Sequence, residues 1–290
     1  MEISASMVKD LREKTGAGMM DCKKALVESN GDMDAAIDYL REKGISKAAK
    51  KAERIAAEGL SNIYVNGNNA VVVELNSETD FVAKNAEFKE LLDKIGNAIL
   101  NNEVNSMEDA LNVKVESDTV NDLIVNATAK IGEKISLRRF EKITKKDTEV
   151  FGTYLHMGGK ISSLTIIEGT NEEVARDVAM QAAAMRPLYE NIESIPESDL
   201  DHEKSIIREQ VINEGKKIEF ADKIIEGRLR KFYEETVLEE QLFIKNSDIT
   251  VKSYLENNNS KLIKLVKYEV GEGMEKRNDD FAQEVMNQIK

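Results

Sequence analysis

The sequence contains few of the residues on which common catalytic and metal sites depend. Its 290 residues include one cysteine, Cys22, two histidines, His156 and His202, and no tryptophan. A single cysteine excludes an intramolecular disulfide, and these three side chains cannot supply a zinc site of the usual nitrogen and sulfur kind. We therefore expect no bound metal, and we expect Cys22 to be a small packed hydrophobic residue.

Motifs that bind phosphate or supply a nucleophile are missing as well. No stretch reads G-x-x-x-x-G-K-[ST], and no G-x-G-x-x-G follows a predicted strand, so the chain shows no loop of its own for cradling a nucleotide. No G-x-S-x-G sequence marks a nucleophile, and the spacing of the many carboxylates singles out no acid and base pair. These absences disfavour an enzyme and predict no cofactor.

Long apolar runs are absent too. No run approaches the roughly 20 residues of a membrane-spanning helix, and the first residues, MEISASMVKDLREK, lack the basic and then apolar layout of a signal peptide. With 41% hydrophobic and 33% charged residues, the composition is that of an ordinary globular protein. We expect a cytoplasmic protein of about two domains.

The balance of charge is acidic. Asp and Glu outnumber Lys and Arg by 54 to 41, a formal net charge of −13, which repels phosphate backbones and argues against nucleic-acid binding as the main activity. The local exception is the sequence KAAKKAER, which contains Lys47, Lys50, Lys51 and Arg54. This basic cluster is either a solvated helix face or, as the alternative, a contact for RNA.

The first 45 residues predict three short amphipathic helices. Apolar residues recur there at helical spacing. Asn30 and Gly31 mark a turn, Asp32 is a suitable N-cap for the third helix, and Gly44 is expected to end that helix. Three helices this short predict a small bundle.

From about residue 56 the hydrophobic period changes to that of strands. LSNIYVNGNNAVVVELN predicts two strands around a turn at Asn66 and Gly67, followed by a helix that carries Phe88. FGTYLHMGGKISSLTIIEG and NEEVARDVAMQAAAM repeat the order strand, turn, strand, helix. Between these units, residues 107–123 read as a helix, and ATAKIGEKISLRRF leads through Gly132 into another strand. The prediction is an α+β fold with two related subdomains.

After Pro187 the sequence becomes strongly helical. Ile206, Ile207 and Val211 precede the break NEGKK, and a second apolar helical pattern follows it, which predicts an antiparallel helical hairpin. The hairpin either packs on its own domain or projects and pairs with a second subunit as a homodimer, because no nearby strand offers its apolar faces a surface. KLIKLVKYEV then predicts a strand, and the chain ends in an amphipathic helix that carries Phe281.

Two long stretches give the chain a family resemblance. LREKTGAGMMDCKKAL, residues 11–26, and TDFVAKN, residues 79–85, closely resemble the signature stretches of bacterial elongation factor Ts, the family of guanine-nucleotide exchange factors for elongation factor Tu. The resemblance extends in order to AKIGEKISLRR at 129–139, EGRLRKF at 226–232 and YEVGEGMEK at 268–276. It therefore covers essentially the whole chain.

The resemblance implies a layout of domains. It predicts a three-helix, ubiquitin-associated-like module at residues 1–54, an N-terminal core subdomain at 55–145 and a C-terminal core subdomain at 146–290. The last of these would contain the helical hairpin, at about 190–228, and a C-terminal helical module, at about 270–290. One departure is Leu242, which stands where the family commonly has proline and predicts a looser local turn.

The resemblance also implies partner-binding residues and no catalytic ones. The family's wedge into the GTPase domain of elongation factor Tu, near its Mg²⁺ and phosphate site, corresponds to Thr79, Asp80, Phe81 and Val82. Further contacts implied on the partner are those of Met19, Met20, Ile131, Gly132, His156, Met157 and Phe281. The implied function is nucleotide exchange without direct binding of nucleotide.

Each of these assignments has a plainer alternative. Ser77 and Asp80 could cap a helix whose face carries both Phe81 and Phe88 into the core, since the two rings lie seven residues apart. Met19 and Met20 could be core residues, and His156 an ordinary strand residue. At the level of the protein, the alternative is an adaptor that recruits a client through its three-helix module.

Overall fold

The computed structural model describes residues 3–15, 17–215 and 218–275. The chain forms two compact units. The first holds the described residues of Met1–Asn66, Ala70–Lys142 and Glu269–Lys290, and the second holds Gly67–Asn69 and Ile143–Tyr268. In the part of the chain that is described, no helix is both long and apolar enough to cross a membrane.

Three helices open the first unit, as the sequence predicts. They are α1 (Ala5–Thr15), α2 (Met19–Glu28) and α3 (Met33–Ala49). Their small core contains Leu11, Cys22 and Leu26, all fully buried, so the expected role of Cys22 is confirmed. The carboxylate of Asp32 accepts a hydrogen bond from the Ala35 amide at 3.0 Å, which makes it the predicted cap.

The prediction that Gly44 ends the third helix is wrong. Gly44 is buried inside α3, which continues to Ala49. A Cβ added there would lie 3.5 Å from Cβ of Ala129, which lies on α7 (Val120–Ile131). At that distance the added side chain would make only an ordinary contact. Gly44 thus lies where α3 packs on α7, and the chain stays in the helical conformation there.

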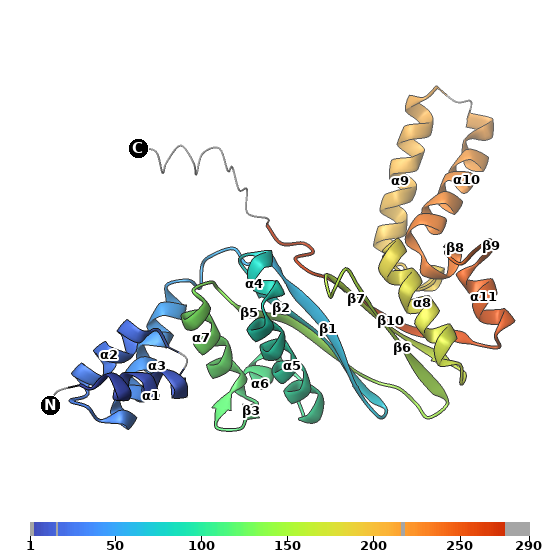
Figure 1. Cartoon of the computed structure of the whole chain (residues 1–290). Helices are drawn as coiled ribbons and strands as arrows, with labels where there is room; N and C mark the ends of the chain where they lie inside the picture. The colour runs from blue at the N-terminus through green and yellow to red at the C-terminus, as the bar shows by residue number, and fades with distance from the viewer. Residues whose placement is uncertain (1–2, 16, 216–217, 276–290) are drawn as a thin grey trace. The chain divides into compact units, whose positions relative to one another are not determined.

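The sheet of the first unit has the strand order β1-β2-β5. Its strands are β1 (Glu58–Asn66), β2 (Asn69–Ser77) and β5 (Ser136–Thr144), and its main covering helix is α5 (Ala86–Asn101). Alternate residues of β2, Val71, Val73 and Leu75, are buried against Phe88 and Ile95 of α5. Figure 1 shows α5 and α7 covering the same face of this sheet.

The expected helix over residues 107–123 is interrupted. Helix α6 (Met107–Asn112) has Val113 as its C-cap. A small antiparallel hairpin of β3 (Lys114–Val115) and β4 (Asp118–Thr119) then precedes α7. Helix α7 begins with a capping box, in which Thr119 accepts from the Asp122 amide at 3.1 Å and donates its own amide to the Asp122 carboxylate at 3.1 Å. This local cap starts a new helix where the apolar pattern alone suggests continuation.

The sheet of the second unit has the order β10-β7-β6. Its strands are β6 (Glu149–His156), β7 (Ile161–Glu168) and β10 (Lys261–Glu269), and β6 pairs antiparallel with β7. Helix α8 (Glu172–Met185) lies across β6 and β7 (Figure 1). A Cβ on Gly152 would lie 2.0 Å from the Ala175 carbonyl oxygen, so only glycine permits this contact of strand and helix backbones.

The predicted helical hairpin is present in the second unit. The short η1 (Ile192–Ser194) precedes α9 (Glu197–Asn213), which is followed by α10 (Ile218–Thr236). Ile207 and Val211 are buried, and the Arg228 guanidinium of α10 pairs with the Glu214 carboxylate at 2.7 Å. The first helix thus begins later, and the second ends later, than the predicted span of about 190–228.

The stretch that contains Leu242 follows the hairpin. It comprises η2 (Leu238–Glu240), β8 (Leu242–Phe243), β9 (Asn246–Thr250) and α11 (Val251–Asn257), with a register shift between Leu242 and Phe243. The buried Gln181 side chain donates to the Leu242 carbonyl at 3.1 Å and accepts from the Ile244 amide at 2.8 Å. These two bonds hold the backbone on both sides of the irregularity.

The segment after β10 packs on the first unit. Fully buried Glu74 of β2 pairs with Arg138 at 2.8 Å and Arg139 at 2.6 Å, and it accepts the Gly271 amide at 2.9 Å. The described part of the motif YEVGEGMEK is therefore docked by a buried charge network. Phe281 and the predicted C-terminal helix lie outside the described residues.

Candidate functional site

The candidate wedge lies on a five-residue helix, α4 (Asp80–Lys84), between β2 and α5. Thr79 is its N-cap, with an extended backbone and a side-chain oxygen that accepts from the Val82 amide at 3.4 Å. Ser77, which the plainer alternative makes the cap, instead donates its hydroxyl to the Thr79 carbonyl at 2.9 Å. The helix ends at Asn85, whose ψ of 140° leaves the helical region before α5 begins.

The Phe81 ring points away from the core, with 80% of the residue exposed. Phe88 is fully buried, so the alternative that both rings share one buried helical face is wrong. The reason is the break at Asn85, because two separate helices need not keep the angular relation of a continuous one. An exposed phenylalanine on a short, capped helix is a feature that contributes little to the stability of its own chain.

The neighbours of Phe81 divide between solvent and core. The Lys84 ammonium forms an ion pair with Asp80 at 2.6 Å and lies 5.8 Å from the centre of the Phe81 ring. On the inner side, Ala83 is buried and half-buried Val82 packs against the core of the first unit. Val82 therefore anchors the helix, and Asp80 and Phe81 form its presented surface.

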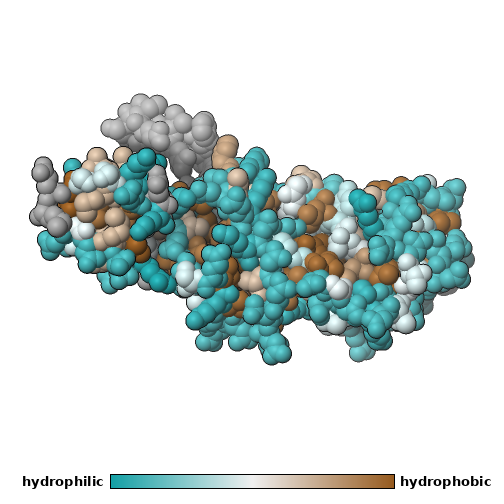
Figure 2. Space-filling model, turned by 60° about the horizontal axis from the view of Figure 1, so that its bottom comes forward, coloured by the Kyte–Doolittle hydropathy of each residue, from teal (hydrophilic) through white to brown (hydrophobic). Residues whose placement is uncertain are grey.

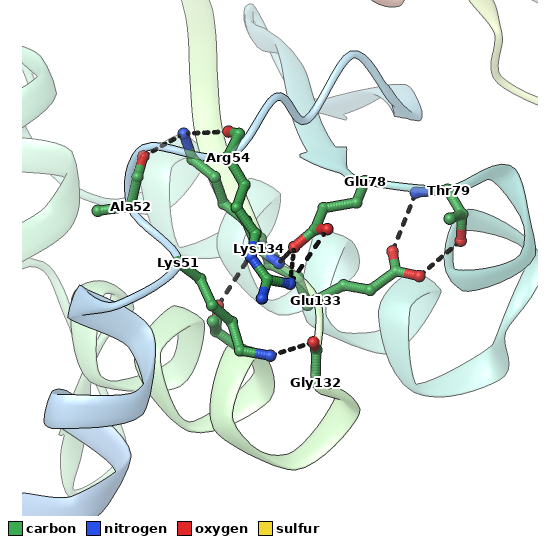
Figure 3. Close-up of polar contacts among 10 residues, drawn as sticks. Lys51, Ala52, Arg54, Glu78, Thr79, Gly132, Glu133 and Lys134 are labelled. Atoms are coloured by element: carbon green, nitrogen blue, oxygen red, sulfur yellow. Dashed lines mark hydrogen bonds and ion pairs between the residues drawn. The ribbon is translucent and has the colours of Figure 1, made fainter. Parts of the chain in front are cut away.

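A second loop holds the start of α4. The Glu133 carboxylate accepts the Thr79 amide at 2.9 Å and the Thr79 hydroxyl at 2.7 Å (Figure 3). In the opposite direction, Glu78 accepts the Lys134 amide at 2.6 Å. The two loops thus exchange carboxylate contacts, which are stronger than neutral hydrogen bonds.

The linker after α3 joins the same network. The Lys51 ammonium donates to the Gly132 carbonyl, and the Lys134 ammonium donates to the carbonyls of Ala52 at 2.6 Å and Arg54 at 3.0 Å (Figure 3). The Arg54 guanidinium donates to Glu78 at 3.3 Å. Two members of the basic cluster are therefore engaged within the chain, which weakens the interpretation of that cluster as an RNA contact.

Ile131 and Gly132 lie at the end of α7, beside this network. Ile131 packs against the core of the first unit. Gly132 adopts a left-handed conformation with φ of 90° and donates its amide to the Thr128 carbonyl at 3.0 Å. Glycine suits this C-terminal position because a side chain would be strained there.

Met19 and Met20 lie at the start of α2 and are 52% and 77% exposed, so the alternative that they are core residues is wrong. Val27, which the sequence analysis did not select, is also exposed on α2. Val27 lies seven positions after Met20, a spacing that places both residues on one face of the helix and could have identified it. Figure 2 shows hydrophobic residues among hydrophilic ones over the N-terminal helices.

His156 and Met157 lie in the second unit, at the turn between β6 and β7. His156 is half-buried and its ring stacks on that of Tyr154 with 6.3 Å between the centres. Met157 is 67% exposed and has a positive φ of 51°. A non-glycine residue with such a backbone in an exposed turn is uncommon and is compatible with a presented contact.

Glu78 and Glu133 were not selected from the sequence. Glu133 lies inside the quoted motif AKIGEKISLRR, but its partner Thr79 is 54 positions away. Only the fold brings them together. In the described part of the chain, no group of three or more His, Cys, Asp or Glu side chains could hold a metal ion.

Comparisons with known proteins agree with the family resemblance. The family model described as Elongation factor TS matches residues 78–272, more than half of the chain. Two curated relatives named Elongation factor Ts, from Limosilactobacillus reuteri strain DSM 20016 and Limosilactobacillus reuteri subsp. reuteri strain JCM 1112, are each 53% identical over 288 residues. The alignments cover 99% of this chain and 99% of each relative. The chain belongs to the elongation factor Ts family.

Proposed function

We propose that this protein is a guanine-nucleotide exchange factor for elongation factor Tu. It binds the complex of that GTPase with GDP and promotes GDP release, without binding nucleotide itself. The observation that carries the mechanism is Phe81, an exposed ring on a capped helix that the rest of the first unit holds in place.

The mechanism uses Asp80 and Phe81 as a wedge. Mg²⁺ tolerates little departure from octahedral geometry, and phosphate is held by fixed backbone amides. A ring inserted near these groups displaces the partner's elements, weakens both contacts and lets GDP leave faster. Because the coupling is reciprocal, GDP weakens the binding of the factor by the same ratio.

Magnitudes show that Phe81 cannot act alone. A change of about 10⁴-fold in affinity corresponds to about 5.5 kcal/mol, whereas burial of one phenylalanine contributes roughly 1.5 to 3 kcal/mol. We propose that the remainder comes from Met19 and Met20 on α2, from Ile131 and Gly132, and from further contacts in the second unit. The contacts in the second unit are those of His156 and Met157. The contact of Phe281, which lies outside the described residues, stays a prediction.

The finer architecture is also a proposal. The three helices would be the family's ubiquitin-associated-like module at 1–54, followed by related core subdomains at 55–145 and 146–290. The shared order of strand, turn, strand and helix, with a helix packed on the sheet in each unit, supports this. The described residues after Tyr268, which the range 146–290 includes, group with the first unit. A factor of translation acts where ribosomes do, so we propose a cytoplasmic location.

For the helical hairpin, we propose packing of its inner face within its own chain over pairing with a second copy. Burial of Ile207 and Val211 supports this. The premise for a homodimer was an apolar face without a surface to pack on, and that premise is weaker once these side chains are covered.

The test is the rate at which labelled GDP leaves elongation factor Tu in a stopped-flow experiment with excess unlabelled GDP. We expect the rate to rise with the concentration of this protein and to saturate. An unchanged rate contradicts the proposal.

A truncated protein that begins at Lys51 separates exchange from an adaptor role. This cut removes α1 to α3 and keeps Lys51, which contacts Gly132. An exchange factor should reach a similar maximal rate at a higher concentration, whereas an adaptor that recruits its client through the three helices should lose binding altogether.

A further inference from the structure

We propose that Glu133 is a positioning residue for Phe81. Its carboxylate, on the loop between α7 and β5, fixes the start of α4 and thereby the direction in which the ring is presented. This inference rests on the proposed function, in which the exposed Phe81 ring enters the partner.

The contact between Glu133 and Thr79 is specific in its geometry. Both carboxylate oxygens are used, one for the Thr79 amide at 2.9 Å and the other for its hydroxyl at 2.7 Å. The same hydroxyl oxygen caps α4 by accepting the Val82 amide at 3.4 Å. Glu133 therefore orients the residue on which the helix begins, from a site 54 positions away in the sequence.

Helix α4 needs such support because of its length. Five residues are far fewer than the roughly 12 to 15 at which an isolated helix becomes marginally stable. Val82 and Ala83 hold its inner side on the core, but two neighbouring side chains leave the helix free to tilt about them. A fixed Thr79 removes that freedom two residues before Phe81.

The loop that carries Glu133 is itself held. Its neighbour Lys134 donates its amide to Glu78 at 2.6 Å and its ammonium to the carbonyls of Ala52 and Arg54. Lys51 donates to Gly132 on the other side. In Figure 3 the linker, the Glu133 loop and the start of α4 meet in one network, so Glu133 acts from an anchored position.

The decisive variant is Glu133→Gln. It preserves volume but removes the charge and keeps only one acceptor oxygen, so the glutamine NH2 can meet the Thr79 hydroxyl only by reversing that hydrogen bond, and both contacts become neutral ones. We expect the maximal rate of GDP release to fall by about fivefold to tenfold, the size typical of weakening charged hydrogen bonds. The matched control is Glu87→Gln, which removes an exposed ion pair with Lys130 near the same helices and should leave the rate unchanged.

A double-mutant cycle distinguishes positioning from a general loss of structure. If Glu133 acts through Phe81, Glu133→Gln should change the rate of a Phe81→Ala protein by less than about twofold. An equal loss in both backgrounds would overturn the inference. If Phe81→Ala alone has no effect on GDP release, the proposed wedge role of Phe81 is wrong. The experiment thus distinguishes failure of the wedge from failure of the positioning role of Glu133.

A direct readout uses the absence of tryptophan from the chain. Phe81→Trp introduces a single reporter, and we expect Glu133→Gln to increase its local motion in time-resolved fluorescence anisotropy of the free protein. Unchanged anisotropy decay would overturn the inference whatever the exchange rate. Should the glutamine variant fail to fold, Glu133→Asp keeps the charge but is too short to reach both Thr79 atoms, and the same decay measurement applies to it.

Discussion

At the scale of single residues, two phenylalanines seven positions apart have opposite roles. Phe88 is fully buried in the core, and Phe81 is 80% exposed. The polar residue between their helices, Asn85, ends α4 and caps α5 by accepting the Glu87 amide at 3.0 Å. A single change of backbone direction therefore separates a residue that stabilises the fold from one that is available to a partner.

This separation predicts different effects of Phe81→Ala and Phe88→Ala. Phe81→Ala should change the free energy of unfolding by less than about 0.5 kcal/mol and should slow GDP release. Phe88→Ala should cost about 3 to 5 kcal/mol, because it leaves a cavity in the core. Denaturant unfolding and stopped-flow release measure both. A large loss of stability in the Phe81 variant would show that its ring belongs to the core.

At the scale of elements, α3 and α7 are joined by a charged contact as well as by packing at Gly44. The Arg41 guanidinium lies 2.8 Å from the Asp122 carboxylate, which is also part of the capping box of α7. Partial burial opposes ionisation, but the hydrogen bonds from Thr119 and the ion pair with Arg41 outweigh it and lower the pKa of Asp122. The Asp122 carboxylate thus takes part in the capping box of α7 and also pairs with Arg41 of α3.

The lowered pKa predicts a pH dependence. Because the folded protein favours the ionised form, this stabilisation is present above the ordinary pKa of an aspartate, about 4. It is lost as the pH falls further, through the lower pKa of the folded state. Asp122→Asn should destabilise the protein at pH 7 by about 1 to 2 kcal/mol, because it removes the charge from the capping-box hydrogen bonds with Thr119 and from the ion pair with Arg41, and it should flatten the acid limb of the stability curve.

The control for this prediction is Arg41→Gln, which removes the ion pair and keeps the capping box. Its cost should be below about 1 kcal/mol, because the arginine side chain is nearly half exposed. Thermal unfolding between pH 3 and 7 provides the comparison. Equal losses in the two variants would show that the cap contributes nothing.

At the scale of the whole molecule, the exposed apolar side chains of the helical hairpin bear on whether the protein forms a homodimer. Its described residues bury Ile207 and Val211, while Ile206 and Ile212 are exposed on α9. A stable interface buries roughly 1,200 Å² or more of surface. Two exposed aliphatic side chains offer much less apolar area than that. Ile207 and Val211 are therefore covered without a second copy.

We expect the protein alone to sediment as a monomer at micromolar concentration and to form a one-to-one complex when mixed with elongation factor Tu. Sedimentation velocity measures both states. A dimer that dissociates on Ile212→Lys would contradict the first expectation and would place the contact on the hairpin.

Helix and strand identities followed from local chemistry, and the sequence by itself predicted most of them. The apolar period places α5, the paired strands β6 and β7 and the hairpin of α9 and α10, because burial of one face leaves a regular trace in the residue pattern. The pattern failed at residues 107–123 and at Gly44. In both places a cap or a helix contact outweighed the propensity on which the expectation depended.

The sequence, through its motifs, also determined the family and nominated Phe81. Tertiary structure alone decided that the Phe81 ring lies outside the core and that Glu133 holds Thr79 across 54 positions. Tertiary structure also decided that the basic linker residues Lys51 and Arg54 are used within the chain. The physical reason is that exposure and hydrogen-bond partners depend on distances between segments, and these distances leave no periodic trace in a single sequence.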